Sequence, residues 1–586
     1  MKNLYKFSLL MILIIIGQTA FADVKSATVD GYCYLEGVDD HGGTLVLFEA
    51  ISPSAQSDST YTNSDGSYLK GLSEGIYTIH YSNSTWLPYT IPGEILISTS
   101  ITLEDVVLHS GMILEVSGSV NGVWTPEYKY HVVGNILVPN SQTLTIEPGV
   151  TVVFQDYYEM KVYGTLIAEG TLADSIIFTS GYIIQKPGDW QRITFENCPL
   201  GNSVISYAKI EFSKDGVECN DAYLEMANST IRRTSRYGIY CLNNSSPNIK
   251  NNTLTYCGYN AHPNSGIFCA ENSSPIIDNN RIDNSYVGIW CTYSSFPTII
   301  QNIIIDNEAT GVYCNYSSHP SIIGNIIRNN SSGVNCYEAS AYIFGNYLSD
   351  NGYGVHFSDA NPVIQNNTIC FNSYGIKCFN TTGFTVLNNI FYENHIGLNI
   401  LSIPTLFNFN LYWDNETNII GNIPNAFGQI ITNNTNGDPC DTYFNLFMDP
   451  EFIDPENYNF QISENSPCID AGNPDPAYID PDGTIAEIGA SYYDQVGIGL
   501  YPFSSHVISV YPNPSNGIIE ISIEGEAEEF QVKVIDLHAK TRRIDIIEKT
   551  SYTTTKQLDL KELPAGIYFI CFFNKEFNQV KKIVIQ

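Results

Sequence analysis

A short phrase returns nine times between Gly216 and Gly397: Gly, then Ile, Val or Leu, then any residue, then usually Cys. Its Gly stands at positions 216, 238, 266, 288, 311, 333, 354, 375 and 397. Successive phrases are 21 to 23 residues apart, except for one spacing of 28. A fixed period in this range is the mark of a solenoid, in which each repeat forms one coil stacked on the next.

A second phrase follows the same period, an Asn with an apolar residue two positions later. It occurs at Asn252, Asn280, Asn302, Asn325, Asn346, Asn367 and Asn389. Between the two phrases lie short runs of Ser, Asn, Gly and Pro, such as Ser273-Ser274-Pro275, which form turns too short to hold a crossover helix. Each period therefore predicts several short strands joined by bends, and stacked Asn side chains can hydrogen-bond to one another.

The repeated phrase also predicts which side chains point inward. Side chains alternate between the faces of a strand, so Ile239 and Cys241 share one face while Tyr240 points to the other. Stacked coils place parallel strands about 4.8 Å apart, and each inward position becomes a column along the axis. One column is expected to contain Cys219, Cys241, Cys269, Cys291, Cys314, Cys336 and Cys378, with Phe357 and Ile400 filling the gaps. Parallel Cα–Cβ bonds at this spacing do not suit a relaxed disulfide, so we interpret these residues as buried thiols.

The pattern resembles the right-handed parallel β-helix proteins of the pectate-lyase-like superfamily, whose repeat has a similar length and often carries an Asn ladder. A leucine-rich repeat shares the period and an Asn or Cys landmark. Here, however, the apolar positions are mostly Ile and Val, and no half of the repeat has a helical pattern. We predict an all-β chain in which a right-handed parallel β-helix is flanked by an N-terminal β-sandwich and a C-terminal β-sandwich sorting domain.

The outward face of the same strands contains the candidate binding residues. Its column is expected to consist of Glu218, Tyr240, Phe268, Trp290, Tyr313, Asn335, His356, Lys377 and Asn399. Four consecutive coils contribute an aromatic residue, Tyr240, Phe268, Trp290 and Tyr313, which predicts a flat strip of rings. Exposed apolar ladders usually mark a binding face, so we predict that this strip binds an extended glycan. The alternative is that a loop, such as the six additional residues near Cys257 to Pro263, covers the rings.

The β-helix resemblance also implies enzymes that act on polysaccharides in a groove along one strand face, as lyases or as hydrolases. His356 and Lys377 lie one coil apart in the outward column, and Glu338 and Asp359 lie in adjoining turns. These four residues are the catalytic candidates. The alternative is that they are polar side chains on a solvated face. No carboxylate pair recurs on adjacent coils, as a glycosidase would need.

Residues 1–22 have the features of a secretory signal peptide: a basic start, an apolar run from Leu9 to Ile16 and Ala20-Phe21-Ala22 before the expected cleavage site. No later stretch approaches the ~18 uninterrupted apolar residues that a membrane helix needs. The mature protein is therefore expected to be exported without a transmembrane segment.

Residues 23–110 contain alternating apolar segments, such as those at 44–48 and 75–79, which predict a small β-sandwich. The runs at 63–68 and 71–77 resemble the carboxypeptidase-regulatory-like domain, and that resemblance implies no catalysis. Residues 111–215 resemble the irregular first coils of secreted β-helix proteins, and the regular repeats are assigned to residues 216–400.

Residues 401–500 resemble the region that closes such β-helices and leads into a linker. Asp480, Asp482 and Glu487 are candidate Ca²⁺ ligands, because hard cations bind several carboxylate oxygens in turn-rich loops. The alternative is an acidic turn in solvent. Cys440 and Cys468 lie outside the cysteine column, and we predict that they are the best pair for a disulfide.

Residues 507–586 closely resemble the type A C-terminal sorting domain of type IX secretion. The resemblance lies in the runs at 511–517 and 560–568 and in the closing Lys581-Lys582-Ile583-Val584-Ile585-Gln586. It implies export by the type IX secretion machinery, removal of this domain, and release or attachment at the outer cell surface.

The net charge of −34 argues against nucleic acid or an anionic membrane as a partner. We therefore predict a secreted or cell-surface β-helix protein that binds carbohydrate or mediates adhesion, with an extracellular polysaccharide or surface glycan as its partner. The alternative is a polysaccharide lyase or glycoside hydrolase that uses the same groove.

Overall fold

The structure of the chain is a computed structural model with two compact units, Met1–Leu114 with Glu127–Lys129, and Glu115–Pro126 with Tyr130–Gln586. It describes residues 26–52, 57–83, 86–91, 95–108, 112–198, 202–258, 264–381, 383–401, 404, 406–475, 478, 480 and 484–493. In the C-terminal domain it describes residues 507–511, 515, 517–524, 529–536, 541–548, 553–564, 566–574 and 577–585. The predicted signal peptide lies outside these residues.

The first unit is a β-sandwich, as predicted. Strand β1 (Ser26–Leu35) pairs with β4 (Ser67–Ser73), β8 (Ile101–Thr102) and β9 (Val106–Leu108). The second sheet contains β2 (Leu45–Ser52), β3 (Ser57–Tyr61), β5 (Gly75–Asn83), β6 (Trp86–Thr90) and β7 (Ile95–Ile97). Fully buried side chains from the two sheets, including Val29, Val46, Phe48 and Ile79, form one core. The two segments with the clearest alternation, 44–48 and 75–79, form β2 and β5.

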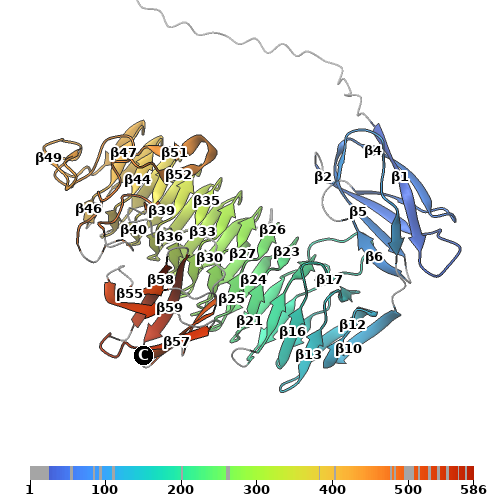
Figure 1. Ribbon diagram of the computed structural model, residues 1–586. Coiled ribbons are helices and arrows are strands. Elements are labelled where there is room, and N and C mark those ends of the chain that lie inside the picture. The colour runs from blue at the N-terminus through green and yellow to red at the C-terminus, as the bar shows by residue number, and fades with distance from the viewer. Residues whose placement is uncertain are drawn as a thin grey trace, which may run out of the picture. The chain divides into compact units, whose positions relative to one another are not determined.

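The second unit contains the predicted parallel β-helix, in which corresponding strands of successive coils lie side by side (Figure 1). Each regular coil has three strands, and we call the three stacks sheets A, B and C. Sheet A contains β21 (Val217–Asn220), β24 (Tyr237–Leu242), β27 (Ser265–Cys269), β30 (Val287–Cys291), β33 (Thr310–Asn315), β36 (Ser332–Tyr337), β39 (Tyr353–Ser358), β42 (Tyr374–Phe379) and β45 (Ile396–Ile400).

Sheets B and C complete each coil. Sheet B contains β25 (Asn248–Lys250), β28 (Ile276–Asp278), β31 (Thr298–Ile300), β34 (Ser321–Ile323), β37 (Tyr342–Phe344), β40 (Val363–Gln365) and β43 (Thr385–Leu387). Sheet C contains β20 (Ala208–Glu211), β23 (Thr230–Arg232), β26 (Thr253–Thr255), β29 (Arg281–Asp283), β32 (Ile303–Ile305), β35 (Ile326–Arg328), β38 (Tyr347–Ser349), β41 (Thr368–Cys370), β44 (Ile390–Tyr392) and β47 (Leu411–Trp413). Irregular strands from β10 (Met112–Ser119) and β12 (Tyr128–Val138) onward precede them.

The repeated phrase encodes the packing of sheet A. A Cβ added at Gly288 would lie 2.5 Å from the carbonyl oxygen of Gly311 in the next coil, so only Gly allows the coils to stack this closely. Ile289 and Cys291 follow and are fully buried. The cysteines of the predicted column are likewise buried thiols, which confirms their interpretation as packing residues.

The predicted Asn ladder lies at the corner between sheets B and C. Asn302 Nδ2 donates to Oδ1 of Asn325 at 3.0 Å and to the carbonyl oxygens of Ile277 and Ile300. A second ladder, which was not predicted, lies at the corner between sheets C and A. It consists of Asn307, Asn330, Asn351, Asn372, Asn394 and Asn415. Both ladders satisfy backbone groups that the bends would otherwise leave unpaired in the interior.

The region after the last regular coils folds back along sheet C, where Phe460 stacks on Tyr347 at 6.0 Å. It includes the two-stranded hairpin of β51 (Phe452–Asp454), the 3-10 turn η1 (Pro455–Asn457) and β52 (Asn459–Ile462). Cys440 and Cys468 belong to one hydrophobic cluster with Leu411 and Ile488. The predicted disulfide between these two cysteines is wrong, because both are buried thiols that fill this core.

The C-terminal domain has two antiparallel sheets, as predicted for a β-sandwich. One contains β53 (Val507–Tyr511), β54 (Ile518–Glu524) and β57 (Thr553–Asp559), and the other contains β55 (Glu529–Asp536), β56 (Thr541–Glu548), β58 (Gly566–Asn574) and β59 (Phe577–Ile585). Ile519, Ile521, Val532 and Ile570 are fully buried in its core. Within the described part of the chain, the structure contains no helix with the length and hydrophobicity needed to cross a membrane.

Candidate binding face

The outer face of sheet A carries the predicted outward column in a continuous parallel register. Glu218 pairs with Tyr240, Tyr240 with Phe268, Phe268 with Trp290, and Trp290 with Tyr313. The register continues through Asn335, His356, Lys377 and Asn399. The strand alternation in the repeated phrase therefore placed these side chains correctly on one face.

The four aromatic residues of the column do not form a flat strip. The rings of Tyr240 and Phe268 are 5.2 Å apart with an interplanar angle of 63°, and those of Phe268 and Trp290 are 5.3 Å apart at 64°. Trp290 and Tyr313 are 5.5 Å apart at 50°. Phe268 is only 9% exposed, whereas Tyr240, Trp290 and Tyr313 are half-buried. The column is a packed aromatic cluster in which the two tyrosine rings and the Trp290 ring remain partly accessible.

A second, flatter group of rings lies at the turn that follows sheet A. Tyr293 and Tyr316 are stacked 5.3 Å apart at an interplanar angle of 13°, and they are 57% and 46% exposed. Both have left-handed backbone conformations, with φ of 45°. The Ser294 backbone N–H donates to the Tyr316 carbonyl oxygen at 3.1 Å, which continues the coil-to-coil pairing through this turn. These tyrosines extend the aromatic surface of the column toward solvent.

Charged groups flank the aromatic cluster at its N-terminal end. Arg236 makes two hydrogen bonds of 2.7 Å to the carboxylate of the fully buried Asp215. Its guanidinium carbon lies 4.7 Å from the ring centroid of Tyr237 and 5.1 Å from that of Tyr240. Burial raises the pKa of Tyr240 to about 12, so its hydroxyl remains a neutral donor at physiological pH. Asp215 also pairs with Arg192 at 3.2 Å, so two guanidinium groups share this buried carboxylate.

The C-terminal end of the face holds the catalytic candidates His356 and Lys377. The Lys377 ammonium lies 5.0 Å from the ring centroid of Tyr353, 4.9 Å from that of Tyr374 and 5.1 Å from that of Phe379. The His356 ring stacks on Tyr353 at 5.0 Å. Burial lowers the pKa of His356, and the charge of Lys377 lowers it further. His356 is therefore neutral at physiological pH.

The other two catalytic candidates lie at the turn after sheet A. Glu338 and Asp359 both have φ of 51°, in the same turn position as Tyr293 and Tyr316. Asp359 accepts a hydrogen bond from Ser358 Oγ at 2.8 Å and another from Asn380. Among the described residues, no ion pair joins Glu338 or Asp359 to the two basic residues. The catalytic role of the four residues stays a prediction.

The predicted Ca²⁺ ligands lie in the region that follows the last coils. The Glu487 backbone N–H donates to Asp480 Oδ2 at 3.3 Å, and Asp482 lies outside the described residues. The described part of the chain contains no group of three or more His, Cys, Asp or Glu side chains arranged to hold a metal ion. Ca²⁺ binding by Asp480, Asp482 and Glu487 stays a prediction.

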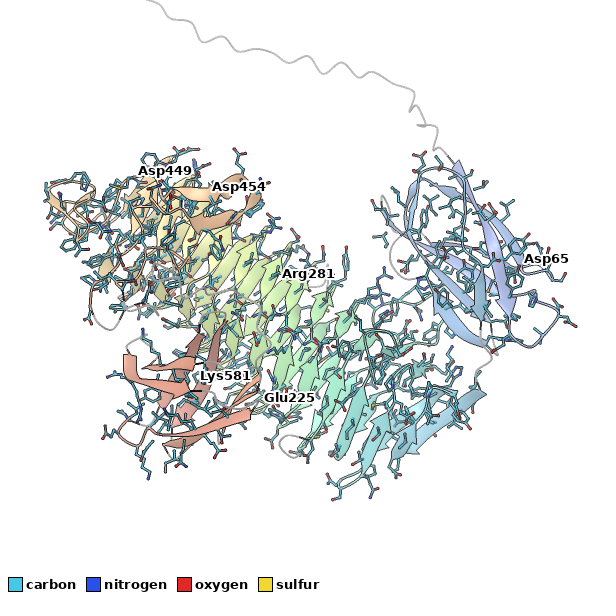
Figure 2. The ribbon with its side chains drawn as sticks, viewed as in Figure 1. Asp65, Glu225, Arg281, Asp449, Asp454 and Lys581 are labelled. Carbon is cyan, nitrogen blue, oxygen red and sulfur yellow. The ribbon has the colours of Figure 1, made fainter. Side chains whose placement is uncertain are left out.

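A groove of about 450 Å³, which the sequence did not indicate, lies between sheet C and the β51–β52 hairpin. Its floor includes Ile303, Ile326 and Tyr347, and Tyr458 lines it from the hairpin. Figure 2 shows Arg281, another lining residue, on the β-helix, and its guanidinium pairs with Asp283 at 2.7 Å. The outward Ile residues of sheet C were the available signal, since they break the alternation of a one-sided strand.

Two family models match this chain. Residues 192–347 match the model of the right handed beta helix region, and residues 509–586 match the model of the secretion system C-terminal sorting domain. The chain is thus a right-handed β-helix protein with a type IX sorting domain, secreted to the cell surface or the extracellular space. None of the curated proteins is similar enough in sequence to count as a match.

Several solved structures are similar to this chain at low identity and low TM-score. The A-module of the mannuronan C-5 epimerase AlgE6 of Azotobacter vinelandii is 16% identical, with a TM-score of 0.34, over 54% of this chain and 91% of that chain. The periplasmic alginate epimerase AlgG is 14% identical, with a TM-score of 0.31, over 51% and 74%. An alginate lyase from Paenibacillus sp. str. FPU-7 is 12% identical, with a TM-score of 0.22, over 45% and 91%.

Proposed function

We propose that the outer face of sheet A binds an extracellular polysaccharide or a surface glycan, and that the protein displays this face at the cell surface for carbohydrate binding or adhesion. The observation that carries the proposal is the aromatic surface that spans consecutive coils, from Tyr240 to Tyr313 in the column and across Tyr293 and Tyr316 beside it. Because this surface runs along the axis of the β-helix, it suits an extended ligand better than a compact one.

The chemistry of the exposed groups supports a sugar ligand. The C–H faces of sugars stack on aromatic rings, and tyrosine and tryptophan provide large contact areas at a low cost in conformational entropy. Tyr293 and Tyr316 also present hydroxyl groups that can hydrogen-bond to sugar hydroxyls. Rings exposed to this degree on a secreted protein are a recognised feature of binding faces.

The test is retention of the mature protein on a panel of neutral and acidic polysaccharides. The double variant Tyr293→Ala/Tyr316→Ala is expected to reduce retention strongly, because it removes the stacked, exposed pair without opening the core. Trp413→Ala is the matched control, since Trp413 is 38% exposed on sheet C and lies off the proposed face. Equal retention of the double variant and the wild type would contradict the proposal.

The second candidate function is a polysaccharide lyase or a glycoside hydrolase that acts on the same face. The observation that favours it is the direct pairing of His356 with Lys377 on adjacent coils. This pair places a neutral imidazole next to an ammonium that aromatic rings hold in position. The same panel, incubated with and without Ca²⁺ and scored for new reducing ends or unsaturated products, tests this function. Cleavage that is lost in both His356→Ala and Lys377→Ala would establish it.

A further inference from the structure

Strand β58 of the sorting domain is apolar on both of its faces. Residues 567–573 consist only of Ile, Tyr, Phe and Cys. Tyr568, Ile570 and Phe572 belong to the core of the domain. Because side chains alternate along a strand, Phe569 points to the opposite face, yet it is fully buried. A strand face that is buried outside the core of its own domain requires a second surface that covers it.

That surface is the outer face of sheet B. Phe569 forms one hydrophobic cluster with residues of the consecutive strands β31, β34, β37 and β40. We call these residues the sheet B patch, and they are Ile300, Ile323, Tyr342, Phe344 and Val363. Ile300 pairs with Ile323, and Ile323 with Phe344, in the parallel register, so the patch is continuous from coil to coil. The sorting domain and the β-helix belong to the same compact unit.

Charged side chains lie beside the patch on the same face of sheet B. Asp278 pairs with Ile300 in the register, and its carboxylate lies 3.4 Å from the Lys250 ammonium. The sorting domain adds Lys581 of β59 to this group, near Glu225 (Figure 2). Burial lowers the pKa of Lys581 to about 8, and the charge of Lys250 lowers it further, whereas Asp278 and Glu225 act in the opposite direction. Two lysines and two carboxylates therefore meet where the two domains approach each other.

We propose that the sheet B patch is a docking surface for the sorting domain, and that this contact keeps the domain on the β-helix after the chain between them is cut. An apolar centre flanked by charged groups is the usual arrangement of a stable protein–protein interface. Before the cut, the high effective concentration of a tethered domain adds to the affinity of the contact. After the cut, the affinity alone holds the domain.

Docking has a consequence for the expected removal of the sorting domain. Cutting the chain is not sufficient to release the domain, because the contact with sheet B must also open. When the domain leaves, the apolar patch becomes exposed on the mature protein. This inference does not depend on glycan binding, since sheet A and sheet B are different faces of the β-helix.

The experiment uses the full chain with the recognition sequence of a specific protease placed between Tyr493 and Val507. After folding and cutting, size-exclusion chromatography over a dilution series gives the dissociation constant of the two pieces. Ile323→Lys places a charge at the centre of the patch and is expected to raise this constant about tenfold or more. Val123→Lys is the matched control, because Val123 is 58% exposed on β11 (Gly122–Trp124), at the far end of the same stack of strands.

A second variant changes the other side of the contact. Phe569→Gln leaves the β-helix unaltered and is expected to weaken the association as strongly as Ile323→Lys does. Co-elution of the cut pieces in wild type and Val123→Lys, together with their separation in the other two variants, would support the inference. Separation of the wild-type pieces at every concentration would overturn it, as would wild-type affinity in Phe569→Gln. Urea unfolding midpoints of the uncut proteins show whether a loss of association reflects a loss of folded protein.

Discussion

The indole Nε1 of Trp290 donates a hydrogen bond to Oδ1 of Asn315 on the next coil, at 3.2 Å. The Trp290 ring also contacts Phe268 and Tyr313, which leaves it half-buried on the outer face of sheet A. Trp290 therefore links the exposed part of the aromatic surface to its packed part. A change at this residue affects both binding and stability.

We expect Trp290→Ala to weaken glycan retention and to lower the free energy of unfolding by about 1–2 kcal/mol, because the variant loses a hydrogen bond and half-buried ring contacts. Trp290→Phe should restore most of the ring contact and most of the retention. Urea unfolding and retention on polysaccharide measure the two effects separately. The expected loss of stability without any change in retention would mean that the ring serves packing alone.

Replacing one Asn of the ladder should destabilise the β-helix far more than replacing an exposed Asn. Asn325 Nδ2 donates to Oδ1 of Asn346 and to the carbonyl oxygens of Ile299 and Ile323, and Asn325 Oδ1 accepts from Asn302. Asn325→Ala leaves several of these buried groups unsatisfied, at a cost of roughly 2–4 kcal/mol. Asn465→Ala, at an exposed position, is the control. Urea midpoints that are equal for the two variants would refute the structural role of the ladder.

The cysteine column should be unreactive in the folded protein. Burial is the main cause that raises the pKa of the Cys314 thiol, and the same effect raises the pKa of Cys468 to about 12. Because the thiolate is the reactive form, iodoacetamide is expected to label these residues only after unfolding. Mass spectrometry with and without denaturant provides the measurement. Native labelling of Cys291 or Cys314 would show that the column opens or that solvent reaches it.

Stability should fall as the pH decreases below 6.5, in part because of His356. Its pKa is lowered from 6.5 in the folded protein, first by burial and then by Lys377. The unfolded state therefore binds more protons than the folded state in the window below 6.5, and the free energy of unfolding decreases there. His356→Gln is expected to flatten this slope. Unfolding curves on both sides of this pH test the difference, and an unchanged slope in His356→Gln would contradict the assignment.

Deletion of residues 507–586 should block export without preventing folding of the β-helix. The removed segment contains complete sheets of its own and the match to the sorting domain. We expect the truncated protein to accumulate in the periplasm in a protease-resistant form, as measured by cell fractionation and limited proteolysis. Normal release of the truncated protein into the medium would disprove the role of the domain.

The sequence predicted the register of the β-helix well, because a fixed period sets which residues stack on one another. The second Asn ladder was readable by the same logic, since Asn307, Asn330, Asn351 and Asn372 recur with the period of the first. The tilt of the aromatic rings could not be predicted in this way, because it depends on side-chain torsions and on the neighbouring Tyr237, which packs against both Tyr240 and Phe268.

The surroundings of Lys377 also could not be predicted from the alternation of side chains along a strand. Tyr374 lies three positions before Lys377, and residues so spaced in a regular strand point to opposite faces. In the structure both lie on the outer face, with Gly375 between them, where the backbone of the next coil approaches too closely for a side chain. Ion pairs such as Arg236 with Asp215 join residues a coil apart and depend on rotamers that the repeat does not specify.

The type of residue at the corner between sheets C and A changes along the axis of the β-helix. Thr234, Cys257 and Ser285 precede Asn307 at this corner, and Ser285 is the first to meet the amide ladder, through its backbone N–H and Asn307 Oδ1. The additional residues of the 28-residue coil follow Cys257, before that ladder begins. Chain length can vary here without removing buried amide contacts. For protein engineering, a foreign peptide or a small domain can therefore be inserted after Gly258. We expect the insert to be displayed next to sheet A while the buried amide ladder stays unchanged.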